Sequence, residues 1–139
     1  MTRYRCGTIG TIMILSLPAW PAPAQQAARP VEASQVVAAG QKSRLRFLYA
    51  IQPDCSSQGR TTVRVLEPPQ HGKLTIEYGQ GFTGFRTDDR RYECNTRKSD
   101  GVLIFYESNP EYLGSDSVTV YAIYPFGNVR TYHYSIDVK

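Results

Sequence analysis

The chain has 139 residues and carries 16 lysines and arginines against 12 aspartates and glutamates, which gives a formal net charge of +4. The arginines are interspersed with acidic residues and form no basic run, so the composition argues against a nucleic-acid-binding protein. The length is sufficient for one small domain with a single hydrophobic core.

The first 24 residues have the pattern of a secretory signal peptide. Arg3 and Arg5 provide a positive start, a short apolar run follows, and Ala22 and Ala24 stand at the small-x-small positions that signal peptidase recognises. The apolar run is shorter than the roughly 20 residues of a membrane-spanning helix, and prolines interrupt it. We therefore predict a signal peptide at residues 1–24 and a mature protein that is periplasmic or secreted and has no transmembrane segment.

The cysteine count supports the same compartment. Of the three cysteines, Cys6 lies within the predicted signal peptide, so the mature chain keeps Cys55 and Cys94. In an oxidising compartment a disulfide is the default state of such a pair. A metal or redox site would need a CxxC spacing or a paired histidine, which the sequence lacks. The sequence predicts a Cys55–Cys94 disulfide.

The mature chain is predicted to begin with a flexible leader at residues 25–31, followed by a single domain at residues 32–139. Within this domain apolar and polar residues alternate with a period of two, whereas no helical period of useful length occurs. The alternating segments are residues 44–49, 62–66, 74–78, 102–106, 118–122 and 132–138.

Turn-forming residues separate these segments. The glycine-rich stretch 79–84 is interpreted as a hairpin loop, residues 99–101 as a turn, and residues 125–128 as the tip of a hairpin between residues 118–124 and 129–138. Six or seven short strands joined in this way predict an all-β fold, an antiparallel β-sandwich of about seven strands.

Several short motifs occur in order in the second half of the chain. They are a tyrosine-containing strand at residues 101–106, an Asn-Pro turn with Gly-x-Asp at residues 109–118, Gly127, and a final alternating strand at residues 134–138. A Pro-x-His-Gly-x-Leu strand entry precedes them at residues 69–74. This order resembles the closing half of bacterial cadherin-like and Ig-like repeats.

The resemblance has structural implications for two residues. It implies that Gly114 serves a sharp turn and that Asp116 bonds nearby backbone amides. The chain departs from the family because it holds one copy, the Cys55–Cys94 pair, and an arginine-rich segment at residues 86–98 that the repeats lack. The acidic linker of calcium-dependent cadherins is missing, and calcium needs six to eight convergent oxygen ligands. No metal is predicted.

Catalytic motifs are not evident in the sequence. The two histidines, His71 and His133, have no recognisable third partner for a metal site. No serine lies in a Gly-x-Ser-x-Gly elbow. Glu107 and Glu111 flank a turn, and a carboxylate pair for glycoside cleavage needs a cleft that a small sandwich hardly provides. We predict no enzyme activity, no catalytic residue and no cofactor.

The ten tyrosines are the one feature that indicates a binding surface. Tyr121 alternates with the expected core residues of its strand, so its ring is expected to face outward. Arg130 or His133 of the next strand can share that face, depending on register. An arginine beside an exposed ring suits an anionic glycan or a carboxylate-bearing partner.

The function predicted from these features is an exported binding or adhesion-type module of the cell envelope, with an envelope protein or a glycan as its partner. Two alternatives stay open at this point. One is a structural envelope subunit, and the other is a small hydrolase or enzyme accessory.

Overall fold

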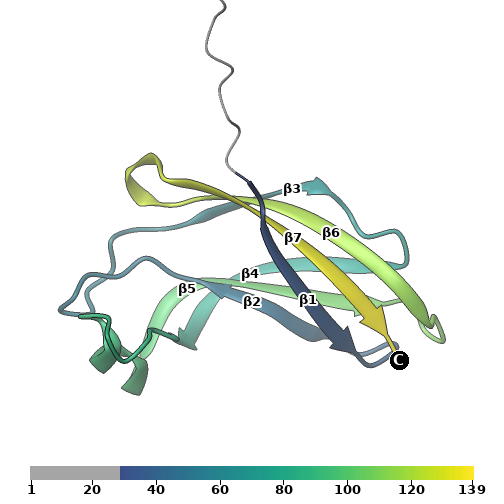
Figure 1. Cartoon of the computed structure of the whole chain (residues 1–139), viewed down its shortest axis with the longest axis horizontal. Coiled ribbons are helices and arrows are strands. Elements are labelled where there is room, and N and C mark those ends of the chain that lie inside the picture. The colour runs from purple at the N-terminus through teal and green to yellow at the C-terminus, as the bar shows by residue number, and fades with distance from the viewer. Residues whose placement is uncertain (1–28) are drawn as a thin grey trace, which may run out of the picture.

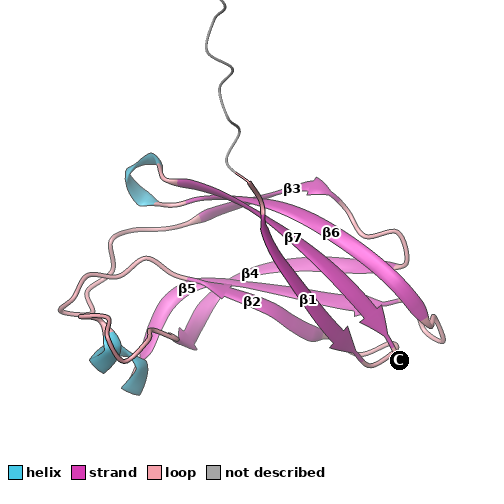
Figure 2. Ribbon diagram, viewed as in Figure 1, coloured by secondary structure: helices cyan, strands magenta, loops and turns pink. Residues whose placement is uncertain are grey.

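The computed structural model describes residues 29–139, which form two packed β-sheets (Figures 1 and 2). The predicted signal peptide and residues 25–28 of the predicted leader lie outside the described residues. The strands are β1 (Val31–Val37), β2 (Ser43–Leu48), β3 (Thr62–Glu67), β4 (Gly72–Phe82), β5 (Lys98–Ser108), β6 (Gly114–Ile123) and β7 (Val129–Val138). Two short 3-10 turns, η1 (Tyr92–Thr96) and η2 (Pro125–Gly127), lie in the connections.

One sheet has the strand order β1-β7-β6-β3 and the other has the order β2-β5-β4. This confirms the predicted seven-stranded β-sandwich, and the predicted hairpin between β6 and β7 is also present. One pair is not antiparallel: β1 runs parallel to β7, with Val31 opposite Tyr132. The sequence pattern did not reveal β1, which begins at Val31, the last residue of the predicted leader.

The core follows from the alternation of side chains along the strands. Val118 and Val120 of β6 face the interior and lie opposite Tyr134 and Tyr132 of β7. The facing sheet contributes the buried side chains of β5, namely Val102, Ile104 and Tyr106. Burial of each such apolar side chain contributes roughly 1.5 to 3 kcal/mol relative to exposure, so these three strands form the stable centre on which the loops are mounted.

Two predicted turns are wrong, because β4 includes the first four residues of the stretch 79–84 and β5 runs through residues 99–101. The glycines there serve close packing. A Cβ on Gly81 would lie 3.0 Å from the ring of Phe47, and one on Gly101 would lie 2.4 Å from the same ring. Glycine inside a strand often marks such a close approach.

The described residues contain no helix long and apolar enough to cross a membrane.

Candidate functional site

Three connections gather at the end of the sandwich that lies away from the C-terminus (Figure 1). They are the β2–β3 connection, the β4–β5 connection with η1, and the β6–β7 turn with η2. We call this region the loop end. Loops held by a rigid sandwich are a common location for binding residues.

The loop end is fastened by the Cys55–Cys94 disulfide, as predicted. The bond joins the β2–β3 connection to η1 across a Cα–Cα distance of 5.5 Å, and Cys94 is fully buried. A terminal guanidinium nitrogen of Arg97 also donates to the carbonyl oxygen of Asp54 at 3.2 Å. The amide of Gly84 also donates to the hydroxyl of Tyr49 at 2.9 Å. The two long connections are therefore held together by one covalent bond and by hydrogen bonds from Arg97 and Gly84.

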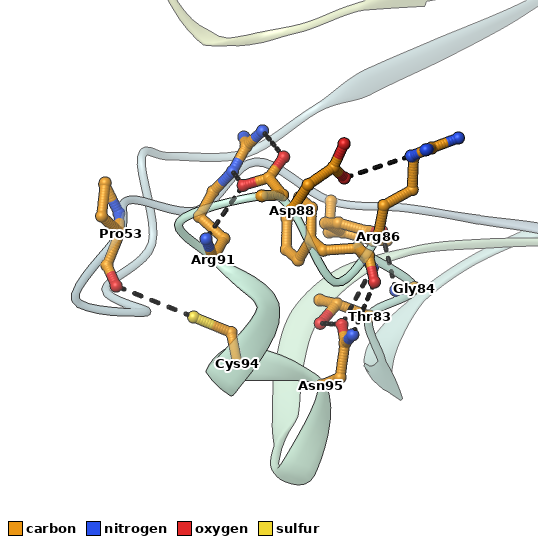
Figure 3. Close-up of polar contacts among 11 residues, drawn as sticks. Pro53, Thr83, Gly84, Arg86, Asp88, Arg91, Cys94 and Asn95 are labelled. Carbon is orange, nitrogen blue, oxygen red and sulfur yellow. Dashed lines mark hydrogen bonds and ion pairs between the residues drawn. The ribbon is translucent and has the colours of Figure 1, made fainter.

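The β4–β5 connection is further shaped by Asn95 (Figure 3). Its side-chain oxygen accepts hydrogen bonds from the Thr83 hydroxyl at 2.8 Å and from the Phe85 amide at 2.9 Å. Its side-chain nitrogen donates to the Phe85 carbonyl at 2.9 Å. All three bonds join the start of the connection to η1, so the segment is closed on itself before β5 begins.

A groove of about 660 Å³ lies at the loop end and is lined by residues of both sheets. Its chemistry is set by three arginines and three tyrosines, namely Arg46, Arg91, Arg130, Tyr49, Tyr124 and Tyr132. No aspartate or glutamate is among the described residues that line it. We call it the arginine groove.

Arg46 of β2 is a partly buried cation of the groove. Its guanidinium carbon lies 4.9 Å from the ring centroid of Tyr132 and 5.9 Å from that of Tyr134, both on the opposite sheet. Its Nε is buried without a hydrogen-bond partner. Within residues 29–139 Arg46 makes no ion pair. The tyrosine rings thus hold the guanidinium through cation–π contact, while its charge stays uncompensated.

Arg91 differs from Arg46 because a carboxylate neutralises it. Its Nε and one terminal nitrogen donate to the two oxygens of Asp89 at 2.9 and 2.8 Å, and its guanidinium lies 4.3 Å from the Phe85 ring centroid. Hydrogen bonds from Arg91 lower the pKa of Asp89 to about 2. Arg91 therefore adds little positive charge to the groove.

Arg130 of β7 supplies the second uncompensated charge. The residue pairs with Ala122 of β6, and its side chain is exposed. Within the described residues, Arg130 takes part in no ion pair. Arg46 and Arg130 come from different sheets, so the fold brings together two cations that are far apart in sequence.

Two tyrosines near Arg46, Tyr124 and Tyr134, have raised pKa values and stay protonated at neutral pH. The hydroxyls of Tyr124 and Tyr132 lie 2.7 Å apart. Burial and this bond raise the pKa of Tyr124, although the charges of Arg130 and Arg46 oppose the shift. Burial also raises the pKa of Tyr134 to about 12, against the charge of Arg46. Neither Tyr124 nor Tyr134 is therefore a phenolate that would cancel the charge of a nearby arginine.

The structure separates the residues of the predicted binding face. Tyr121 and His133 lie on the outer face of the β1-β7-β6-β3 sheet, where His133 Nδ1 is 2.9 Å from the Thr119 hydroxyl. Arg130 lies opposite Ala122, whose side chain is buried, and therefore projects to the other side of the sheet. Tyr121 itself is partly buried.

Sequence reasoning missed Arg46 because strict alternation placed it outside the core. The register between β2 and β5 shifts between Arg44 and Arg46, and the shift puts Arg46 opposite the buried Ile104. An irregularity of this kind re-aims side chains. One signal of the irregularity is present in the sequence: Leu45 and Leu48 are three residues apart, so both cannot face the core of a regular strand. In the structure both side chains are buried.

Gly114 and Asp116 lie at the opposite end of β6. Gly114 has a φ of +133°, a conformation that favours glycine. Asp116 accepts hydrogen bonds from the amides of Gln70, His71 and Ser117 at 3.0, 3.0 and 2.8 Å, and from the Tyr106 hydroxyl at 2.9 Å. These contacts fasten the entry of β4 to β6.

The part of the chain that the structure describes contains no group of three or more histidine, cysteine, aspartate or glutamate side chains placed to hold a metal ion. Comparison of the whole chain with protein-family models, with curated proteins and with solved structures finds no match in any of the three.

Proposed function

We propose that the protein is an exported binding module of the cell envelope, periplasmic or secreted, which takes a carboxylate group of its partner in the arginine groove. One observation carries the proposal. The groove holds two cations, Arg46 and Arg130, that have no ion-pair partner in the described chain, and no acidic side chain lines it.

Charge and burial together favour an anionic partner. A guanidinium that is partly removed from water loses hydration, and a buried donor without an acceptor carries a penalty of about 1–3 kcal/mol. Arg46 has both properties. A carboxylate in the groove would compensate the charge of the guanidinium, and charge-assisted bonds of this kind are roughly twice as strong as neutral ones.

The groove is also preorganised for such a ligand. The rings of Tyr132 and Tyr134 hold Arg46 in place. The adjoining connections are held by the Cys55–Cys94 disulfide and by the hydrogen bonds of Asn95. Little side-chain entropy is then lost when a ligand binds, which favours affinity. Tyr49 and Tyr124 add ring surface and a hydroxyl next to the cations, an arrangement that suits a sugar acid or a carboxylate-bearing peptide.

The experiment compares two carboxylate sources by calorimetry. An oligomer of a uronic acid and a glutamate-rich peptide are each titrated into the protein, beside a neutral oligosaccharide of matched length. We expect the neutral sugar to bind at least tenfold more weakly than one of the two acids. We also expect the affinity for that acid to fall as salt is added, because salt screens the arginine charges.

Substitutions locate the site. Arg46→Gln and Arg130→Gln are each expected to weaken binding about tenfold, since each removes one charge-assisted contact. Arg44→Gln is the matched control, because Arg44 lies on the same strand and is exposed, but does not line the groove. Equal losses in all three variants would contradict the proposed site, as would equal affinity for the acidic and the neutral sugar.

A further inference from the structure

Strand β4 leaves one long edge of the three-stranded sheet open. It is the outer strand in the order β2-β5-β4, and all 11 of its residues pair with β5 without a register shift. Among the described residues, no strand pairs with its other side. An unpaired edge of this length, with neither proline nor bulge, is a ready template for another strand.

The backbone groups at this edge can be assigned by alternation. The carbonyl of His71 accepts a bond from the Asn109 amide, so His71 points toward β5. Successive residues of a strand point their amide and carbonyl to opposite sides. Leu74, Ile76 and Tyr78 therefore direct their backbone groups toward the open edge, where a partner strand can bond to them.

The side chains along β4 are complementary to themselves. Lys73 and Glu77 stand two residues on either side of Thr75, and Leu74 and Ile76 stand one residue on either side. If a second copy pairs antiparallel with β4 and the two-fold axis passes at Thr75, Lys73 of each copy lies opposite Glu77 of the other copy. A two-fold axis at Lys73 or at Glu77 would place like charges opposite each other, which is destabilising.

The groups that this pairing uses are available. Lys73 is exposed and makes no ion pair within residues 29–139. Glu77 is bonded to Lys42 at 2.6 Å, but its side chain keeps 45% of its surface exposed, which leaves room for a second cation. Leu74 and Ile76 are only partly buried, and Tyr78 is 54% exposed. A partner strand beside β4 would cover the part of these apolar side chains that the β2-β5-β4 sheet leaves exposed.

We infer that the protein self-associates as a two-fold symmetric dimer through the open edge of β4, in the register that sets Lys73 against Glu77. The two three-stranded sheets then form one continuous six-stranded sheet, and the interface is isologous. Because the paired strands are antiparallel, the loop ends of the two copies lie at opposite ends of the dimer. The inference does not depend on the proposed ligand.

Sedimentation equilibrium of the mature protein over a concentration series tests the dimer. We expect the average mass of the unmodified protein to rise from one copy to two. Lys73→Glu and Glu77→Lys each place like charges at both contacts, so each variant alone is expected to associate at least tenfold more weakly. Arg44→Glu is the control, because it reverses a charge on β2, at the opposite edge of the same sheet.

The decisive sample is an equimolar mixture of the Lys73→Glu and Glu77→Lys chains. Each contact in the mixed dimer pairs opposite charges again, so we expect association to return to the level of the unmodified protein. An unmodified protein that stays a single copy at all soluble concentrations overturns the inference. So does a mixture that associates no better than its components, or an Arg44→Glu variant that loses association to the same degree. Circular dichroism of each variant establishes that it is folded.

Discussion

Replacing both Cys55 and Cys94 by alanine is expected to lower the free energy of unfolding by about 4 kcal/mol. The two residues are 39 positions apart in sequence, and closing a loop of that length removes about this much conformational entropy from the unfolded chain at 25 °C. Alanine is the appropriate replacement because Cys94 is fully buried, and a serine hydroxyl there would add a separate desolvation penalty.

Urea unfolding followed by circular dichroism measures the change. Because the disulfide acts on the unfolded state, the variant should also unfold with a steeper dependence on urea, since its unfolded chain exposes more surface. The unmodified protein in the presence of a thiol reductant is the control and should behave like the variant. A loss below about 1 kcal/mol would refute the reasoning, because it would mean that the unfolded chain between Cys55 and Cys94 is already restricted without the bond.

Two further predictions concern packing and acid stability. Gly101→Ala is expected to destabilise by about 1–3 kcal/mol in urea unfolding, because its Cβ would lie 2.4 Å from the ring of Phe47. Gly84→Ala, with no atom within 4 Å of the added Cβ, should change stability little. Burial raises the pKa of Asp116, but hydrogen bonds from backbone amides and Tyr106 outweigh it and leave the pKa below 3.8. Stability from this carboxylate is therefore present above pH 3.8 and lost as the pH falls through the lowered value. Unfolding midpoints between about pH 5 and pH 2 should fall less steeply in Asp116→Asn than in the unmodified protein.

The fold could be predicted from the sequence where large apolar residues occupy the inward positions. Strands β5, β6 and β7 satisfy this condition, and the alternation of apolar and polar residues predicted all three. In β1 the inward positions include Ala33 and Gln35, which are small or polar, so the alternation is too weak to recognise. The strand is held mainly by its parallel pairing with β7, which depends on a distant segment.

The turns predicted at residues 79–84 and 99–101 were wrong for a related reason. Glycine occurs both in turns and at close contacts between packed segments, and a single sequence does not distinguish the two. Gly81 and Gly101 both lie against Phe47, a residue of a different strand. Only the three-dimensional packing shows that glycine is needed at these positions because there is no room for a side chain, and not because the chain turns there.

The candidate site was less accessible to sequence reasoning than the fold. Arg130 was selected from the sequence as a candidate binding residue together with Tyr121, but the register of β6 and β7 separates the two and places Arg130 beside Tyr124 in the arginine groove. Arg46 joins it there only because of the register shift in β2. Both facts depend on strand register, which periodicity alone does not determine when charged residues occupy strand ends.

Side-chain NMR tests most directly whether Arg46 and Arg130 together receive a carboxylate. The arginine Nε–H signals of the ¹⁵N-labelled protein are followed while glucuronate is added, with glucose as the neutral control. We expect the Arg46 and Arg130 signals to shift together and to reach saturation with glucuronate but not with glucose. Shifts confined to the outer face around Tyr121 and His133, or equal shifts with glucose, would contradict it.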